Sequence, residues 1–325
     1  MEQSIPNKRN SFINLIKNSR AFALLIIIAV ILLVVSLIYP KTFGTWENFS
    51  TILLNMSAES MILIAMTILL ISGEIDLSLG SIMVLGAITC GMLMIRYDIP
   101  IYLSILITLS ISLIIGLING LIVAKLQVTS FIATLATGMI YLGIAIKLAG
   151  TGWTNFPDQL FKALGQEKLF SLQLPVYYMI IAVALFAFLI ARTRYFRQYY
   201  YIGGNQKAAG LSGINIVKSK IVAFMLAALL SSISGIISAM RFNSAIPSVG
   251  AGVELRAVTA AVVGGVSFTG GSGTILGAAF GALFIAVLNN ALAAAKVSPD
   301  LQYCVTGVVL ILAIVTNIVA SKKKQ

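Results

Sequence analysis

The sequence IYLSILITLSISLIIGLINGLIV, residues 101–123, runs for 23 positions without a charged side chain. At about 1.5 Å per residue, a helix of this length covers the roughly 30 Å hydrocarbon core of a bilayer. Other apolar stretches lie on both sides of it. The long ones are 21–39, 51–72, 175–191, 221–240 and 299–319, and the shorter or more polar ones are 81–95, 128–149, 257–268 and 274–295.

The composition of the whole chain agrees with repeated crossing of a membrane. Of the 325 residues, 59% are hydrophobic and 10% are charged, against about 25% charged in a typical soluble domain. We therefore predict a single all-α, polytopic membrane domain over residues 1–325, with about ten transmembrane helices. Because 257–268 is only 12 residues long, eight spans with one re-entrant segment are the alternative.

Residue types that carry covalent chemistry or bind metals are scarce. The chain contains no histidine, which excludes a histidine base, metal ligand or proton relay. Cys90 and Cys304 lie in separate apolar stretches without a spacing motif, which favours small buried residues over a disulfide or a metal site. No G-x-x-x-x-G-K-S/T sequence is present. We therefore expect this chain to be no enzyme, to bind no metal or cofactor, and to rely on a separate subunit for any ATP hydrolysis.

The distribution of basic residues predicts the orientation of the chain. With ten spans and the N-terminus inside, the inner segments hold 14 of the 22 Lys and Arg residues against one acidic residue, and the outer segments hold eight against six. Because Lys and Arg are enriched in cytoplasmic loops, we predict that the N-terminal segment 1–20 and the basic tail 320–325 are both cytoplasmic. The same bias explains the net charge of +12 without a nucleic-acid partner.

Acidic residues occur at two places in the apolar pattern. The run SGEIDLSLGS, residues 72–81, contains Asp76 and Ser78 between two apolar stretches. These side chains either contact a substrate or order the loop and cap the next helix. Glu59 lies inside 51–72, where it either faces a transport pathway or reaches the outer surface.

Glycines and amides give further candidates for a pathway. The run GGVSFTGGSG contains Gly264, Gly265, Gly270, Gly271 and Gly273. It predicts unwound backbone that lines a cavity at membrane depth and forms a flexible gate, with a tight turn as the alternative. Gly116-x-x-x-Gly120 and Gly277-x-x-x-Gly281 predict close helix packing.

Two asparagines lie in similar surroundings inside apolar stretches. Asn119 is found in Ile118-Asn119-Gly120 and Asn289 in Leu288-Asn289-Asn290. Such amides commonly form hydrogen bonds between helices, and less often bind a ligand. Because the two runs have opposite predicted orientations, they indicate a possible inverted repeat.

Three segments resemble the permease subunits of ribose-type ABC sugar importers. They are GEIDLSLGS at 73–81, FIATL at 131–135, and 263–281 with its central GGSG. The resemblance covers nearly the whole chain and implies a permease of the bacterial cytoplasmic (inner) membrane. It implies three partners: an ABC ATPase that uses ATP, an extracytoplasmic sugar-binding protein and a second permease chain. The expected pathway residues are Glu59, Asp76, Ser78, Asn119, Phe131, Thr134 and Asn289.

The loop 192–220 is the longest predicted cytoplasmic loop. Its sequence KAAGLSG, residues 207–213, resembles the coupling pattern Glu-Ala-Ala-x-x-x-Gly of importer permeases, with Lys in place of Glu. The resemblance implies that the ATPase docks on a helix with the residues Lys207, Ala208, Ala209, Leu211 and Gly213. Lys218 and Lys220 lie beyond that pattern, and we expect them to contribute little.

The expected function is import of a monosaccharide or a related small polyol-like solute. One alternative keeps the ABC permease but gives it autoinducer-2 or another solute other than ribose. The other is an ion-coupled secondary transporter, which would use Glu59, Glu74 or Asp76 as its coupling site. Glu74 also stands where the family pattern has a small residue, which would change the local charge.

Overall fold

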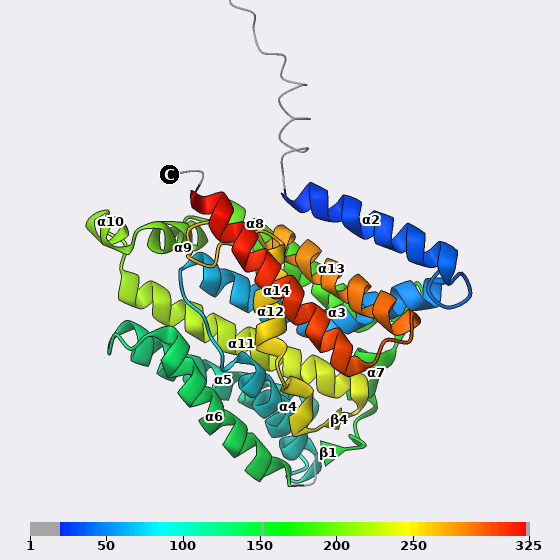
Figure 1. The fold of residues 1–325 in the computed structure, drawn as a ribbon. Coiled ribbons are helices and arrows are strands. Elements are labelled where there is room, and N and C mark those ends of the chain that lie inside the picture. Colours follow the sequence, from blue (N-terminus) through cyan, green and yellow to red (C-terminus); the bar gives the residue numbers. More distant parts are fainter. Residues whose placement is uncertain (1–19, 151–152, 323–325) are drawn as a thin grey trace, which may run out of the picture.

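The computed structural model describes residues 20–150 and 153–322, so most of the predicted N-terminal segment and the end of the basic tail lie outside the described residues. Within this part the chain forms a bundle of helices joined by short connections (Figure 1). The helices of the bundle are α2 (Arg20–Ile38), α3 (Trp46–Ile71), α4 (Leu79–Ile95), α5 (Ile101–Ala124), α6 (Ser130–Ala149), α8 (Leu174–Arg192), α11 (Ile216–Phe242), α12 (Val253–Val263), α13 (Ile275–Ala294) and α14 (Pro299–Lys322).

Short elements lie at the two ends of the bundle. At one end, near the C-terminal end of α14, are α9 (Arg194–Gly204) and α10 (Gln206–Leu211) (Figure 1). At the other are α7 (Gln159–Gln166), the 3₁₀ helix η1 (Pro247–Gly250) and four two-residue strands. β1 (Trp153–Thr154) pairs antiparallel with β4 (Ser244–Ala245), and β2 (Lys168–Leu169) pairs antiparallel with β3 (Leu172–Gln173).

Six helices of the described residues are long and apolar enough to cross a membrane: α3, α5, α6, α8, α11 and α13. Shorter apolar helical segments cover Phe22–Ile38, Leu79–Ile95 and Asp300–Val315. The stretch predicted at 257–268 is instead the 11-residue helix α12, which ends where Gly264 and Gly265 begin the glycine run. At about 1.5 Å per residue it is roughly 16 Å long, about half the hydrocarbon thickness.

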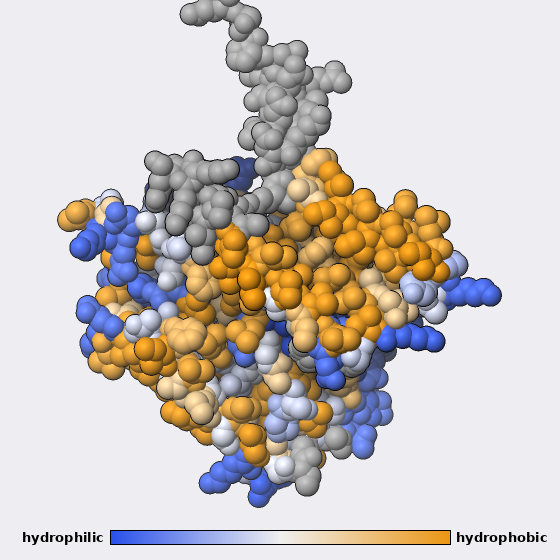
Figure 2. Space-filling model, viewed as in Figure 1, coloured by the Kyte–Doolittle hydropathy of each residue, from blue (hydrophilic) through white to orange (hydrophobic). Residues whose placement is uncertain are grey.

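The core of the bundle lies around α3 and α11. Ten consecutive residues of α3, from Ile62 to Ile71, are buried, because this half of the helix is surrounded by other helices. Apolar side chains on α2, α5, α6 and α8 are exposed instead. Figure 2 shows one apolar region of the surface, which lies over α2, α13 and α14. Exposed apolar helix surface of this extent suits contact with lipid.

Both predicted small-residue motifs pack helices closely, as expected. A Cβ on Gly116 would lie 2.5 Å from the Cα of Met225, so α5 and α11 touch through their backbones. A Cβ on Gly281 would lie 2.0 Å from the carbonyl oxygen of Ala260, which joins α13 to α12 in the same way. The predicted inverted repeat remains a prediction.

Candidate functional site

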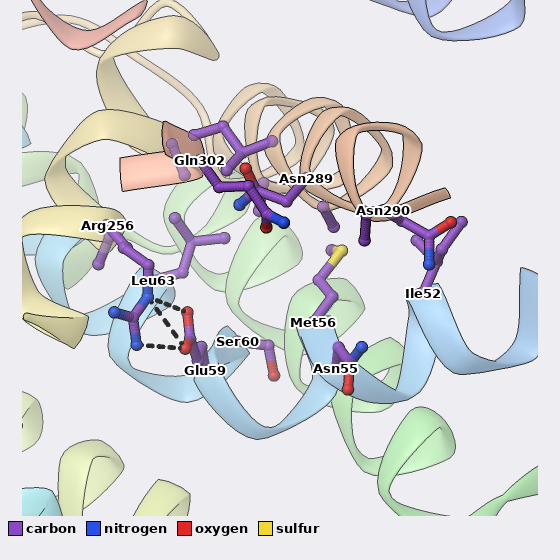
Figure 3. A pocket seen from close by; sticks show the side chains of 16 residues that line it. Ile52, Asn55, Met56, Glu59, Ser60, Leu63, Arg256, Asn289, Asn290 and Gln302 are labelled. Atoms are coloured by element: carbon purple, nitrogen blue, oxygen red, sulfur yellow. Dashed lines mark hydrogen bonds and ion pairs between the residues drawn. The ribbon is translucent and has the colours of Figure 1, made fainter. Parts of the chain in front are cut away.

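A cavity of about 320 Å³ lies between α3, α12, α13 and α14 (Figure 3). Its walls on α3 and α13 come from positions three and four residues apart, which share one face of a helix. The end nearest the start of α3 is polar, and the opposite end is apolar. The polar residues are Asn55, Glu59, Ser60, Arg256, Asn289, Asn290 and Gln302; the apolar floor includes Leu63, Ala260, Ala282 and Ile285.

An ion pair joins α3 to α12 at the polar end. Nε of Arg256 donates to Oε1 and Oε2 of Glu59 at 3.2 and 3.3 Å, and Nη2 donates to Oε1 at 2.7 Å (Figure 3). Nη1 of Arg256 donates to the carbonyl oxygen of Ala251 at 3.1 Å. Among the residues that the structure describes, Glu59 and Arg256 are the only charged ones that line the cavity. The lining is therefore close to neutral overall and rich in groups that form hydrogen bonds.

Two amide contacts join the other walls at the same end. Nδ2 of Asn48 donates to Oδ1 of Asn290 at 2.9 Å, between α3 and α13. The hydroxyl of Thr306 donates to Oδ1 of Asn289 at 3.4 Å, between α14 and α13. The predicted pathway residues Glu59 and Asn289 thus lie on one cavity, although 230 positions separate them in the sequence.

A second group of predicted residues meets in the break between α3 and α4. Oδ1 of Asp76 accepts hydrogen bonds from the backbone N–H of Ser78 at 2.8 Å and from its hydroxyl at 2.5 Å. Nδ2 of Asn119 donates to Oγ of Ser78 at 2.9 Å, and the hydroxyl of Tyr141 donates to Oδ1 of Asn119 at 2.9 Å. Asp76, Ser78 and Asn119 are buried. Their side chains satisfy one another and hold the break against α5 and α6.

Backbone groups of the break are held by α6. The N–H of Leu77 donates to Oγ1 of Thr134 at 2.9 Å, and that of Ile75 donates to Oγ of Ser130 at 3.3 Å. Ser78 occupies the N-cap position of α4, but its side chain makes no capping bond there. Phe131 lies apart from this group, with 51% of its surface exposed.

The glycine run is unwound, as predicted, but none of its residues lines the cavity. Instead it packs against the ends of α3 and α9. The N–H of Gly271 donates to the carbonyl oxygen of Ile71 at 2.9 Å, and a Cβ on Gly270 would lie 2.8 Å from the carbonyl oxygen of Gly203. Gly270 and Gly271 have φ angles of +92° and +74°. The physical reason for this glycine content is therefore close backbone packing and positive φ, and not a cavity wall.

The predicted coupling segment forms the short helix α10. Oδ1 of Asn205 caps it by accepting from the N–H of Ala208 at 3.0 Å, and Gly213 follows it with φ +85°. Lys207, Ala208 and Leu211 are exposed, Leu211 by 92%. Ala209 is buried against the rest of the protein, so it attaches α10 and does not face a partner.

Lys220, which we expect from the sequence to contribute little, has two side-chain partners in the structure. Its Nζ lies 2.5 Å from Oε1 of Glu74, and the two side chains are only 11% and 10% exposed. The same Nζ donates to Oε1 of Gln206 at 3.2 Å. The sequence contains one signal of this pair, since Glu74 adds a charge where the family resemblance implies a small residue. Lys220 could not be recognised as the partner of Glu74 from the sequence, because 146 positions separate the two residues.

Comparison with known proteins decides which family contains this architecture. A family model described as the permease component of the branched-chain amino acid transport system matches residues 48–314, which is most of the chain. The chain belongs to this permease family. The predicted multi-pass membrane protein of the permease class is thereby confirmed.

Individual relatives of the permease cover nearly its full length. The ribose import permease protein RbsC of Haemophilus influenzae is 36% identical over 316 residues, 95% of each chain. The L-arabinose transport system permease protein AraH of Escherichia coli is 33% identical over 94% of this chain and 92% of its own. The galactose/methyl galactoside import permease protein MglC of Escherichia coli is 33% identical over 98% of each chain. No solved structure matches.

The Asp76 cluster leads to a prediction that separates charge from hydrogen bonding. Asp76→Asn keeps an oxygen that accepts from Ser78, so we expect near-normal amounts of folded permease and at least half of the wild-type uptake. Asp76→Ala leaves buried donors without an acceptor, which costs about 1–3 kcal/mol, and should lower the melting temperature. The measurements are thermal unfolding in detergent and uptake in vesicles. Normal folding of Asp76→Asn with lost uptake would show that transport needs the charge.

Proposed function

We propose that this permease is the membrane subunit of an ATP-driven importer for a monosaccharide or a related neutral polyol. The observation that carries the proposal is the cavity lining, in which amides and a hydroxyl surround an internally neutralised ion pair. Sugar hydroxyls donate and accept hydrogen bonds, and amide side chains offer both kinds of group. The names of the relatives, which specify ribose, L-arabinose and galactose, support the same solute class.

The cavity also fits the proposed direction of transport. We place both termini in the cytoplasm of a bacterium and the permease in the inner membrane, because basic residues concentrate on that side. In this orientation the polar end of the cavity lies toward the outside. It would receive the solute from an extracytoplasmic binding protein, and a second permease chain would complete the membrane unit. Among the pathway residues, we assign substrate contact to Glu59 and Asn289 and assign the Asp76 cluster to positioning.

ATP hydrolysis is assigned to a separate subunit that docks on α10. The exposed side chain of Leu211 supports this assignment, because an apolar group of this size at the tip of a polar, basic loop suits insertion into a partner. The helix α9, which directly precedes α10, touches the glycine run and the end of α3, so a partner bound at α10 would act on the cavity helices through α9.

The ion-coupled alternative has less support from the contacts of its acidic residues. A coupling carboxylate must gain and lose its ion during transport. Glu59 is paired with Arg256, Glu74 is paired with Lys220, and Asp76 accepts hydrogen bonds inside a buried cluster. Autoinducer-2 or another solute remains compatible with the same ATP-driven route, so it is included in the substrate test.

The test is uptake into proteoliposomes that contain the permease, its ATPase and its binding protein. Labelled ribose, L-arabinose, galactose and autoinducer-2 are compared, with and without ATP and with and without an ionophore. We expect uptake of one neutral solute that requires ATP and resists the ionophore. Uptake that proceeds without ATP and stops with the ionophore would favour the secondary transporter and overturn the proposal.

Replacement of Asn289 tests whether the cavity carries the solute. Asn289→Leu removes a hydrogen-bonding amide worth about 1 kcal/mol and should reduce uptake at low solute concentration about fivefold, since about 1.4 kcal/mol corresponds to a factor of ten. Val308→Leu, on an exposed position of α14, is the control. An unchanged KM in Asn289→Leu would move the solute path away from this cavity.

A further inference from the structure

Lys220 joins three segments that are far apart in the sequence. It belongs to the first part of α11, and its Nζ contacts Glu74 in the break between α3 and α4 and Gln206 at the start of α10. Lys218, two residues nearer the start of α11, is exposed and has its side chain in none of these contacts. Two lysines in the same helical turn therefore differ in burial and in partners.

The Glu74 end of this contact belongs to a firmly held segment. The N–H of Glu74 donates to the carbonyl oxygen of Leu69 at 2.9 Å, which fixes it to the end of α3. The three residues that follow are bound to α5 and α6 through Asn119, Ser130 and Thr134. A displacement of Glu74 therefore moves a segment that is attached to α4, α5 and α6.

The Gln206 end belongs to the predicted docking helix. Gln206 is the first residue of α10, directly after the capping residue Asn205. A separate contact connects the neighbouring helix α9 with the other half of the bundle, since the hydroxyl of Tyr200 donates to the carbonyl oxygen of Gly273 at 2.8 Å. The α9–α10 unit thus has one attachment toward α12 and α13 and another toward α4, α5 and α6.

The Glu74–Lys220 pair is the firmest part of this second attachment, because both charges are largely withdrawn from water, whereas the hydrogen bond from Lys220 to Gln206 is exposed. A charge that is withdrawn from water interacts strongly with its partner and is unfavourable without it. Separation of α10 from the break would expose or isolate these charges. Exposed pairs, by contrast, contribute little and shift easily.

We propose that Glu74 and Lys220 are positioning residues that transmit the displacement of α10 to the break between α3 and α4. Through this pair, movement of the docking helix acts on α4, α5 and α6 at the same time as it acts on α12 and α13 through Tyr200. The pair thereby couples ATP hydrolysis to opening of both halves of the bundle. The transport part of this inference rests on the proposed function, whereas the mechanical part does not.

Five variants, one of them a control, separate transmission of movement from simple charge neutralisation. Glu74→Gln and Lys220→Met each break the pair, and Lys218→Met is the matched control. The double variant Glu74→Leu/Lys220→Met replaces the pair by apolar side chains, which commonly preserves folding. The reversed pair Glu74→Lys/Lys220→Glu can keep both contacts, because the amide of Gln206 can donate as well as accept.

The first measurement is hydrogen exchange of the purified permease, with no ATPase present. We expect exchange of the segments 72–78 and 206–211 to rise about tenfold in Lys220→Met and in the apolar double variant, with the reversed pair and Lys218→Met like the wild type. Unchanged exchange in the apolar double variant would overturn the mechanical link. This result does not depend on which solute is carried or on ATP.

The second measurement is solute transported per ATP hydrolysed in proteoliposomes. We expect the single variants and the apolar double variant to assemble with the ATPase but to transport about tenfold less per ATP, and the reversed pair to restore the ratio. A normal ratio in the apolar double variant would show that the pair is only structural. If the wild type itself shows no ATP-dependent uptake, the proposed function fails, and the exchange experiment still decides the link.

Discussion

Gly203→Ala is expected to abolish uptake and to lower the melting temperature of the permease, whereas Gly204→Ala leaves both near the wild-type values. A Cβ on Gly203 would lie 2.0 Å from the carbonyl oxygen of Ile71 and 2.6 Å from the backbone nitrogen of Gly271. Both neighbours are backbone atoms that hydrogen-bond to each other at 2.9 Å. A methyl group at this junction forces α3, α9 and the glycine run apart, and overpacking of this kind costs about 1–3 kcal/mol.

Gly204 is a closely matched control for this change. It is the next residue of the same helix, and no atom lies within 4 Å of a Cβ placed on it. Thermal unfolding in detergent and uptake in proteoliposomes measure the two effects separately. Gly271→Val should resemble Gly203→Ala, because Gly271 has φ +74° and its Cβ would approach Gly204 to 2.8 Å. Wild-type stability and uptake in both variants would show that the junction is an ordinary linker.

Leu211→Asp is expected to abolish binding of the ATPase while the permease itself folds normally. The side chain is 92% exposed, so its removal costs the isolated permease little. Full burial of a Leu side chain contributes about 1.5–3 kcal/mol, and a carboxylate in its place would remain without a partner. Co-purification with the ATPase is the measurement, with a loss of more than tenfold as the expected result.

Leu126→Asp provides the control for this second change. Leu126 is 68% exposed and lies in the short connection between α5 and α6, on the predicted cytoplasmic side. It should retain full ATPase binding. Gly213→Leu should act differently, through the end of α10, because φ +85° disfavours a side chain. Normal ATPase binding by Leu211→Asp would place the docking surface elsewhere.

The sequence predicts helices well where one physical requirement dominates. The uncharged run 101–123 corresponds to α5, which ends one residue beyond it, because a long apolar run has only one stable backbone arrangement in lipid. The end of α12 was harder to predict. Val266 and Phe268 extend the apolar pattern past the last helical residue, but Gly264 and Gly265 end the helix, since Gly265 adopts φ +91°.

Side-chain pairing in the site depends on tertiary structure and is only partly predictable. Glu59 and Asn289 are recognisable as polar residues in apolar stretches, but nothing local indicates that they share one cavity. Nothing in the sequence distinguishes Arg256 from the other basic residues, because its partner Glu59 is 197 positions away. The glycine run was predicted to be unwound from its composition. Its packing against Gly203 could not be predicted, since two distant backbones must be placed together first.

The short helix α12 has a consequence for the electrical insulation of the cell. The cavity extends down to Ala260 and Leu63, and directly beyond it α12 and α13 touch backbone to backbone at Gly281. If the cavity carries the solute, the seal against ions below it is shorter than the full length of α3, and a larger share of the membrane voltage falls across that part. At about 2.3 kcal/mol per elementary charge per 100 mV, this shorter seal bears the force that drives protons inward. Substitutions that separate α12 from α13 would thus let protons leak inward and lower the membrane potential, even if the solute were still carried.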